Sequence, residues 1–137
     1  MPTRPTAVVI DDSPIMRMVL KTMLSQIVDV VAEGVSGEDA LPLYERFRPT
    51  VLTMDIVMPG RDGIVVATEL LARHPTATIV MCSSLSTGDK IVACQKLGVA
   101  HYLLKPFNAE KVLSAMRYVL ARREARMGQP QASRRAS

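Results

Sequence analysis

The chain has 137 residues, of which 48% are hydrophobic, 22% charged and 4% aromatic, with no Trp. This length suits one domain with its own core of aliphatic side chains. No apolar run approaches the roughly 20 residues of a membrane span, the polar start does not have the pattern of a signal peptide, and two Cys are too few for a disulfide framework. We therefore expect a cytoplasmic protein without membrane insertion.

The net charge of +4 comes from the C-terminal end of the chain. Residues 1–120 have 12 Lys or Arg and 12 Asp or Glu, whereas residues 121–137 have five Arg and only Glu124. A basic end can bind nucleic acid or anionic lipid, but more often it is a solvated terminus. We assign it no function, expect no nucleic-acid partner, and divide the chain into a folded domain over 1–126 and a basic, disordered tail over 127–137.

Short apolar runs alternate with amphipathic stretches along the chain, which predicts alternating strands and helices. The expected strands cover 7–10, 28–33, 51–54, 78–82 and 102–104. The expected helices have apolar stripes over 16–27, 40–47, 64–71, 91–97 and 112–120. Ser13 with Pro14 and Asn108 are expected to begin helices, and Gly98 to end one.

This alternation predicts crossovers between parallel strands in a sheet covered on both faces. Five strands favour the flavodoxin-like doubly wound (βα)5 fold, with the order 2-1-3-4-5. Strands 1 and 3 are then neighbours, so that Asp11, Asp12 and Asp55 converge at their carboxyl ends. Ser83 and Lys105 are expected at the ends of strands 4 and 5, in the same pocket.

Three crowded carboxylates repel one another, which would either raise a carboxyl pKa or require a cation. Oxygen ligands without Cys or His suit Mg²⁺, to which the backbone carbonyl of Val57 could add a ligand. Lys105 and the Ser83 hydroxyl could hold the oxygens of a phosphoryl group. Because a carboxylate can act as a covalent nucleophile, Asp55 is the expected acceptor.

Asp11-Asp12, Asp55, Ser83 and Lys105-Pro106-Phe107 together resemble the receiver domain of two-component response regulators. The resemblance covers about residues 5–122. The segments D-D-S-P-I-M-R, M-D-I-V-M-P-G-R-D-G and K-P-F are most similar to the single-domain chemotaxis regulators of the CheY type.

This resemblance implies roles for the acidic residues. Asp55 matches the aspartate that a partner histidine kinase phosphorylates. Asp12 matches the direct Mg²⁺ ligand, Asp11 the acid that holds a water on the metal, and the Val57 backbone the third protein ligand.

The resemblance also implies a switch that leads away from the acids. Ser83 matches the hydroxyl that moves onto the phosphoryl group, and Tyr102 the aromatic side chain that turns inward when it moves. Lys105 matches the family's lysine, whose bond to Pro106 is cis. The fourth helix, fifth strand and fifth helix would form the face that a partner reads.

Two positions specialise the pattern. Val57 and Leu85 put apolar side chains beside the acceptor where some relatives carry polar ones, so we expect slower loss of phosphate than in those relatives. Ser83-Ser84-Leu85 is more similar to the receivers of chemotaxis methylesterases than to a motor-binding regulator, but no methylesterase domain follows.

Asp62 is expected to be a turn residue and not a fourth metal ligand. Cys82 and Cys94 are expected in the core.

We therefore expect a signalling switch and not an enzyme, apart from self-catalysed phosphotransfer and autodephosphorylation. Its partners would be a histidine kinase and a downstream protein, such as a flagellar motor switch or a relay protein, and the chain a monomer or weak dimer. Chemotaxis is ranked first, and a phosphorelay or phosphate-sink intermediate second.

Two other classes of function are weighed against this one. A Mg²⁺-dependent aspartyl-phosphate phosphatase needs a second acid two residues after the nucleophile, where Val57 stands. A flavin-binding protein needs a phosphate loop after the first strand, where the acidic pair would repel phosphate.

Overall fold

A computed structural model describes residues 4–84 and 87–127, so that Leu85 and the tail residues 128–137 lie outside the described residues. The strands are β1 Thr6–Ile10, β2 Asp29–Gly34, β3 Val51–Met54, β4 Ile79–Ser83 and β5 His101–Leu104. The helices are α1 Pro14–Leu24, α2 Ala40–Phe47, α3 Gly63–Arg73, α4 Gly88–Leu97 and α5 Ala109–Met127, with a 3-10 turn over Gly37–Asp39. None of the described helices combines the length and hydropathy needed to cross a membrane.

The five strands form one parallel sheet in the order β2-β1-β3-β4-β5, which confirms the predicted doubly wound fold. Ile10 at the end of β1 lies opposite both Gly34 of β2 and Met54 of β3. The next residues along β1 and β3 are Asp11 and Asp55. The topology therefore brings these two acids to the same edge of the sheet.

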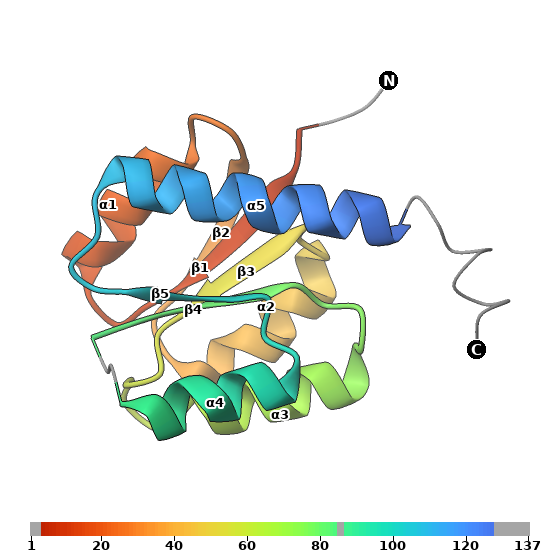
Figure 1. Ribbon diagram of the computed structural model, residues 1–137. Coiled ribbons are helices and arrows are strands. Elements are labelled where there is room, and N and C mark those ends of the chain that lie inside the picture. The colour runs from red at the N-terminus through yellow and green to blue at the C-terminus, as the bar shows by residue number, and fades with distance from the viewer. Residues whose placement is uncertain (1–3, 85–86, 128–137) are drawn as a thin grey trace, which may run out of the picture.

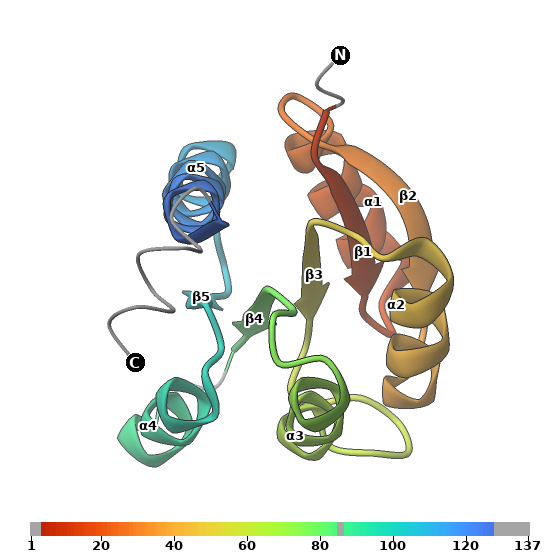
Figure 2. The same cartoon turned by 90° about the vertical axis from the view of Figure 1, so that its right-hand side faces the viewer.

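Side chains alternate between the two faces of the sheet, as a strand's period of two requires. In β1, Val8 and Ile10 pack in the core on the side of α2 and α3, whereas Ala7 and Val9 pack on the side of α1 and α5. Figure 1 shows α1 and α5 above the sheet and α3 and α4 below it, and Figure 2 shows the same layers end-on.

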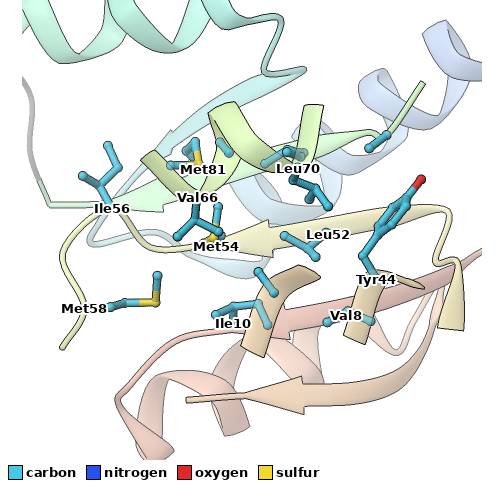
Figure 3. Packing of buried hydrophobic residues seen from close by; sticks show 14 of the residues in the cluster. Val8, Ile10, Tyr44, Leu52, Met54, Ile56, Met58, Val66, Leu70 and Met81 are labelled. Carbon is cyan, nitrogen blue, oxygen red and sulfur yellow. The ribbon is translucent and has the colours of Figure 1, made fainter. Parts of the chain in front are cut away.

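The core on the lower side packs against β3, the strand that precedes Asp55. Leu52 and Met54 of β3 are fully buried there. Figure 3 shows them beside Val66 and Leu70 of α3. Removing such a fully buried side chain costs about 2–5 kcal/mol. This packing therefore stabilises β3, which ends one residue before Asp55.

The helices begin and end largely where the sequence predicts. Ser13 Oγ accepts a hydrogen bond from the backbone N–H of Met16 at 3.1 Å, with Pro14 at the first helical position. Asn108 Oδ1 accepts one from the backbone N–H of Lys111 at 2.8 Å, just before α5. Gly98 ends α4 in the left-handed conformation with φ of 97°.

The predicted end of the first helix is wrong, because α1 stops at Leu24 and Ile27 lies in the following turn. The Ser25 hydroxyl donates to the carbonyl oxygen of Lys21 at 2.6 Å, which competes with the helical hydrogen bonds. The turn closes through hydrogen bonds from the N–H groups of Ile27 and Val28 to Leu24. Ile27 still packs against the core, so its apolar character reflects burial after the helix has ended.

Candidate phosphoacceptor site

Asp11 and Asp55 extend the sheet by one residue on adjacent strands. The backbone N–H of Asp11 donates to Gly34 at 3.1 Å, and that of Asp55 donates to Ile10 at 3.2 Å. The two residues are buried, at 1% and 8% exposure respectively. Their backbones are fixed by the sheet, so the positions of the carboxylates follow from the topology.

Lys105 joins these two carboxylates. Its Nζ donates to Asp11 Oδ2 at 2.9 Å and to Asp55 Oδ2 at 2.8 Å. Its backbone N–H donates to the carbonyl oxygen of Ser83 at 2.9 Å, which places it at the end of β5 beside β4. The peptide bond to Pro106 is cis, the isomer expected from the resemblance.

Asp12 completes a cluster of three carboxylates at the edge of the sheet. Ligand oxygens of Asp11, Asp12 and Asp55 all lie within 4.8 Å of one another, and Asp12 is the exposed member. With the Lys105 ammonium, the three carboxylates leave a formal charge of −2. Such a cluster of hard oxygen donors, open to solvent on one side, fits a divalent cation that keeps part of its hydration, as Mg²⁺ does.

Backbone N–H groups hold the free oxygens of two of these carboxylates. Asp11 Oδ1 accepts from the N–H of Ser13 at 2.9 Å, and Asp55 Oδ1 accepts from the N–H of Val57 at 3.1 Å. The Val57 side chain is 60% exposed. Each buried carboxylate is therefore oriented by a backbone donor on one oxygen and by Lys105 on the other.

The pKa of Lys105 reports the balance of forces in this pocket. Burial alone would lower it, but hydrogen bonds to Asp55 and Asp11, and their charges, raise it above the ordinary lysine value. The ammonium form is thus favoured at neutral pH.

In β4, burial raises the pKa of the Cys82 thiol to about 12. Cys82 is therefore a core residue and not a reactive thiol, in agreement with the prediction for it.

Ser83 and Tyr102 connect the site to the outer part of the sheet. Ser83 is fully buried at the end of β4, and Tyr102 is half-buried on β5. Burial raises the pKa of Tyr102, and a side-chain hydrogen bond with Ser83 partly opposes this effect. The two residues proposed as a switch are thus in contact.

The loop after Asp55 is shaped by a glycine at the start of α3. The N–H of Gly63 donates to the carbonyl oxygen of Ile56 at 2.8 Å. A Cβ on Gly63 would meet the carbonyl oxygen of Asp55 and would lie 2.7 Å from the Cα of Ile56. Only glycine lets α3 approach the backbone of Asp55 this closely.

Asp62 lies outside the acidic cluster, as expected of a turn residue. It precedes α3, where its Oδ1 accepts from the N–H of Ile64 at 2.7 Å.

Sequence reasoning missed Arg17. Its Nη1 donates to the carbonyl oxygen of Asp11 at 2.6 Å, and its Nε donates to Glu33 Oε1 at 3.2 Å. The signal was the Arg at the end of D-D-S-P-I-M-R, one turn after the Ser13 cap.

Comparison with known proteins agrees with this geometry. Residues 7–117 match the family described as "Response regulator receiver domain". The chemotaxis protein CheY of Listeria monocytogenes is 33% identical over 109 residues, which cover 79% of this chain and 92% of that protein.

Two solved structures have the same fold. The signal receiver domain of the response regulator NarL from Mycobacterium tuberculosis superposes with a TM-score of 0.82 and 28% identity, covering 88% of this chain and 98% of that one. The Borrelia burgdorferi CheX–CheY complex with BeF3 and Mg²⁺ gives a TM-score of 0.80 and 25% identity, covering 83% of this chain and 87% of that one. The fold, the cluster of acids and these similarities show that the chain belongs to the family of response regulator receiver domains.

Proposed function

We propose that this chain is a phosphorylation-dependent switch in which Asp55 accepts a phosphoryl group from a histidine kinase in the presence of Mg²⁺. The observation that carries the proposal is the Lys105 ammonium, which donates to both Asp11 and Asp55 beside a third carboxylate. A purely structural ion pair would not need the third carboxylate, Asp12, left exposed next to the two buried ones.

The proposed reaction is a transfer from nitrogen to oxygen. A carboxylate oxygen of Asp55 attacks phosphorus, the P–N bond of the phosphohistidine breaks, and the bonding electrons return to the imidazole. Lys105 and the Ser83 hydroxyl hold the phosphoryl oxygens, because positioning and charge neutralisation do most of the work in phosphoryl transfer. Asp11, Asp12, Asp55 and the Val57 carbonyl would hold Mg²⁺, which would supply the remaining positive charge when bound. Autodephosphorylation follows when water attacks phosphorus and the carboxylate of Asp55 leaves.

The proposed output begins at Ser83 and Tyr102. A phosphoryl group on Asp55 competes with Tyr102 for the Ser83 hydroxyl, so that phosphorylation changes the position of Tyr102. Tyr102 lines a groove of about 250 Å³ between α4 and β5, together with Ile91 and Leu104. A change at the site therefore alters the surface made by α4, β5 and α5, which we propose a partner protein reads.

That surface has the features of a protein contact. A second groove, of about 640 Å³, lies between β5 and α5. Its rim carries Tyr118, which is 52% exposed and whose ring lies 6.0 Å from that of His101. Aromatic side chains beside grooves are common at the centres of protein interfaces.

The acidic site itself has an apolar border. Ile15 and Met18 on the first turns of α1 are 71% and 63% exposed, and Val57 stands beside Asp55. Exposed apolar side chains around a charged pocket favour a protein as the donor of the phosphoryl group.

We propose that the chain and its donor kinase are cytoplasmic. The free cysteines Cys82 and Cys94 fit that compartment, because it keeps thiols reduced.

For the pathway we propose chemotaxis, with a phosphorelay or phosphate-sink role as the second candidate. The similarity to chemotaxis proteins named CheY supports the first, and the related Borrelia protein is named in a complex with CheX. The downstream partner would then be a flagellar motor switch or a relay protein. We propose a single receiver domain over residues 1–126.

Uptake of phosphate from phosphoramidate, a small donor with a P–N bond, tests the proposal. Intact-mass spectrometry of the full chain should show one added phosphoryl group with Mg²⁺ and none with EDTA. Asp12→Asn should lower the rate, because it removes the exposed carboxylate of the cluster.

Asp62→Asn is the matched control, since it removes an acid seven positions after Asp55 while Asn still caps α3. Its rate should equal that of the wild type. Equal uptake with and without EDTA, together with equal rates for Asp12→Asn and wild type, would contradict the proposed metal site.

A further inference from the structure

A basic groove lies at the end of the sheet opposite to the acids. It has a volume of about 220 Å³ and lies between α5 and the segment that joins α4 to β5. Its lining consists of Thr78, residues 98–100, Val119, Arg122, Arg123 and Arg126. Thr78 immediately precedes β4 and Ser83 ends it, so the two residues lie about 16 Å apart along the strand. This groove is therefore separate from the proposed phosphorylation site.

The three arginines are held together by helical spacing. Arg122 and Arg126 are four residues apart, so they lie on one face of α5 and repel each other. The guanidinium of Arg122 lies over the ring of Tyr118, with 5.5 Å from Cζ to the ring centroid. Among the described residues, none of the three arginines forms an ion pair with an acid, and no acid lines the groove.

A buried hydroxyl in the same lining also lacks a partner. Thr78 is 4% exposed, and its Oγ1 makes no hydrogen bond within the part of the chain that the structure describes. A buried polar atom without a partner costs about 1–3 kcal/mol. Because this oxygen is closed to solvent, it cannot donate to an anion in the groove unless the side chain rearranges.

The backbone of the groove offers few donors of its own. The N–H groups of Gly98, Val99 and Ala100 donate to carbonyl oxygens of the fold. The accessible donors are therefore the guanidinium groups. Guanidinium groups bind phosphate and carboxylate oxygens through paired hydrogen bonds.

We propose that this groove binds a small phosphate-type dianion, such as inorganic phosphate or a phosphomonoester, through Arg122, Arg123 and Arg126. A dianion matches the unpaired charge better than a carboxylate, and its tetrahedral oxygens can accept from several directions at once. The groove volume is several times the roughly 30 Å³ that one water occupies, which leaves room for such an ion. The bound anion would tie α5 to the segment before β5.

The test is a titration of the full chain with inorganic phosphate, followed by ¹H–¹⁵N NMR. EDTA is present to remove divalent metal, and chloride keeps the ionic strength constant. The protein carries Asp55→Asn, so that the acceptor site is altered and the result is independent of the proposed phosphorylation. We expect saturable shifts at Thr78, residues 98–100 and residues 122–126.

Variants separate a built site from general charge. Arg126→Gln should weaken phosphate binding at least about tenfold, because it removes charged hydrogen bonds. Arg46→Gln removes one exposed positive charge on α2 and should leave binding unchanged.

Three results would overturn the proposal. Equal binding by wild type, Arg126→Gln and Arg46→Gln would show a response to overall charge. Shifts that follow ionic strength without saturation would show screening only. Binding to vesicles containing phosphatidylglycerol, without saturable binding of inorganic phosphate, would make the arginines a membrane contact instead.

Discussion

The ammonium of Lys105 lies 2.8 Å from Oδ2 of Asp55, although the two residues are 50 positions apart in the sequence. The same ammonium lies 2.9 Å from Asp11 Oδ2, so a single positive charge compensates two nearly buried carboxylates. Phosphoryl transfer to Asp55 would need this charge close to the acceptor oxygens. The contact therefore links the stability of the edge of the sheet to the proposed chemistry.

Lys105→Ala should lower the free energy of unfolding by about 3 kcal/mol in metal-free buffer, because it leaves two carboxylates without a counter-ion. Added Mg²⁺ should raise the melting temperature of this variant more than that of the wild type. Differential scanning calorimetry with and without Mg²⁺ measures both effects. Lys96→Ala, which removes an exposed lysine from α4, is the control and should behave as wild type. An equal response to Mg²⁺ in Lys105→Ala and wild type would contradict the charge balance described above.

Tyr102 should ionise at a higher pH than a free tyrosine, because burial disfavours its phenolate. The folded-state pKa is raised above the unfolded value of 10.0, so the Tyr102 contribution to stability is present below pH 10 and lost as the pH rises through the folded value. The ultraviolet difference between wild type and Tyr102→Phe, followed against pH, gives the ionisation directly. A midpoint at or below pH 10 would show that the ring is more open to water than the structure indicates.

Gly63→Ala should lower stability by about 1–3 kcal/mol, since its Cβ would meet backbone atoms of Asp55 and Ile56. It should also slow phosphate uptake, because the backbone that carries Asp55 must shift. Chemical denaturation and the phosphoramidate assay measure the two effects. Gly88→Ala is the matched control at the start of α4, where a Cβ meets no atom within 4 Å. That variant should be neutral or slightly more stable, and equal losses in both would contradict the packing argument.

A double substitution of Val57 and Leu85 by Asn should shorten the lifetime of the phosphorylated protein. Val57 is 60% exposed beside Asp55, where an apolar side chain cannot hold an attacking water. Polar side chains at both positions should therefore speed hydrolysis several-fold. Release of inorganic phosphate after removal of the donor measures the rate. A half-life that is unchanged or longer in the double variant would refute this prediction.

The fold was predictable because the signals for strands, helices and caps agreed with one another. Alternating apolar runs gave the parallel order, and Asn108 and Gly98 marked the ends of helices through chemistry local to each turn. The end of α1 was not predictable from its apolar stripe. Ile27 continues the spacing of the stripe, but it is buried in the turn that follows the helix.

The acidic cluster was predictable for a different reason. In a parallel sheet, the residues that follow adjacent strands must meet, which places Asp11 beside Asp55. The contact of Arg17 with the backbone of Asp11 depends on how α1 docks on the sheet, and no pattern in the sequence encodes that angle. The Thr78 hydroxyl, which has no hydrogen-bond partner among residues 4–84 and 87–127, is likewise a result of packing that the sequence does not reveal.

The location of the phosphoryl group tests the central claim most directly. Wild type and Asp55→Asn are treated with phosphoramidate and Mg²⁺, reduced with borohydride to mark acyl phosphates, digested and sequenced by mass spectrometry. The account predicts a mark on Asp55 in the wild type and none in the variant. A mark on another residue, or equal labelling of Asp55→Asn, would contradict it.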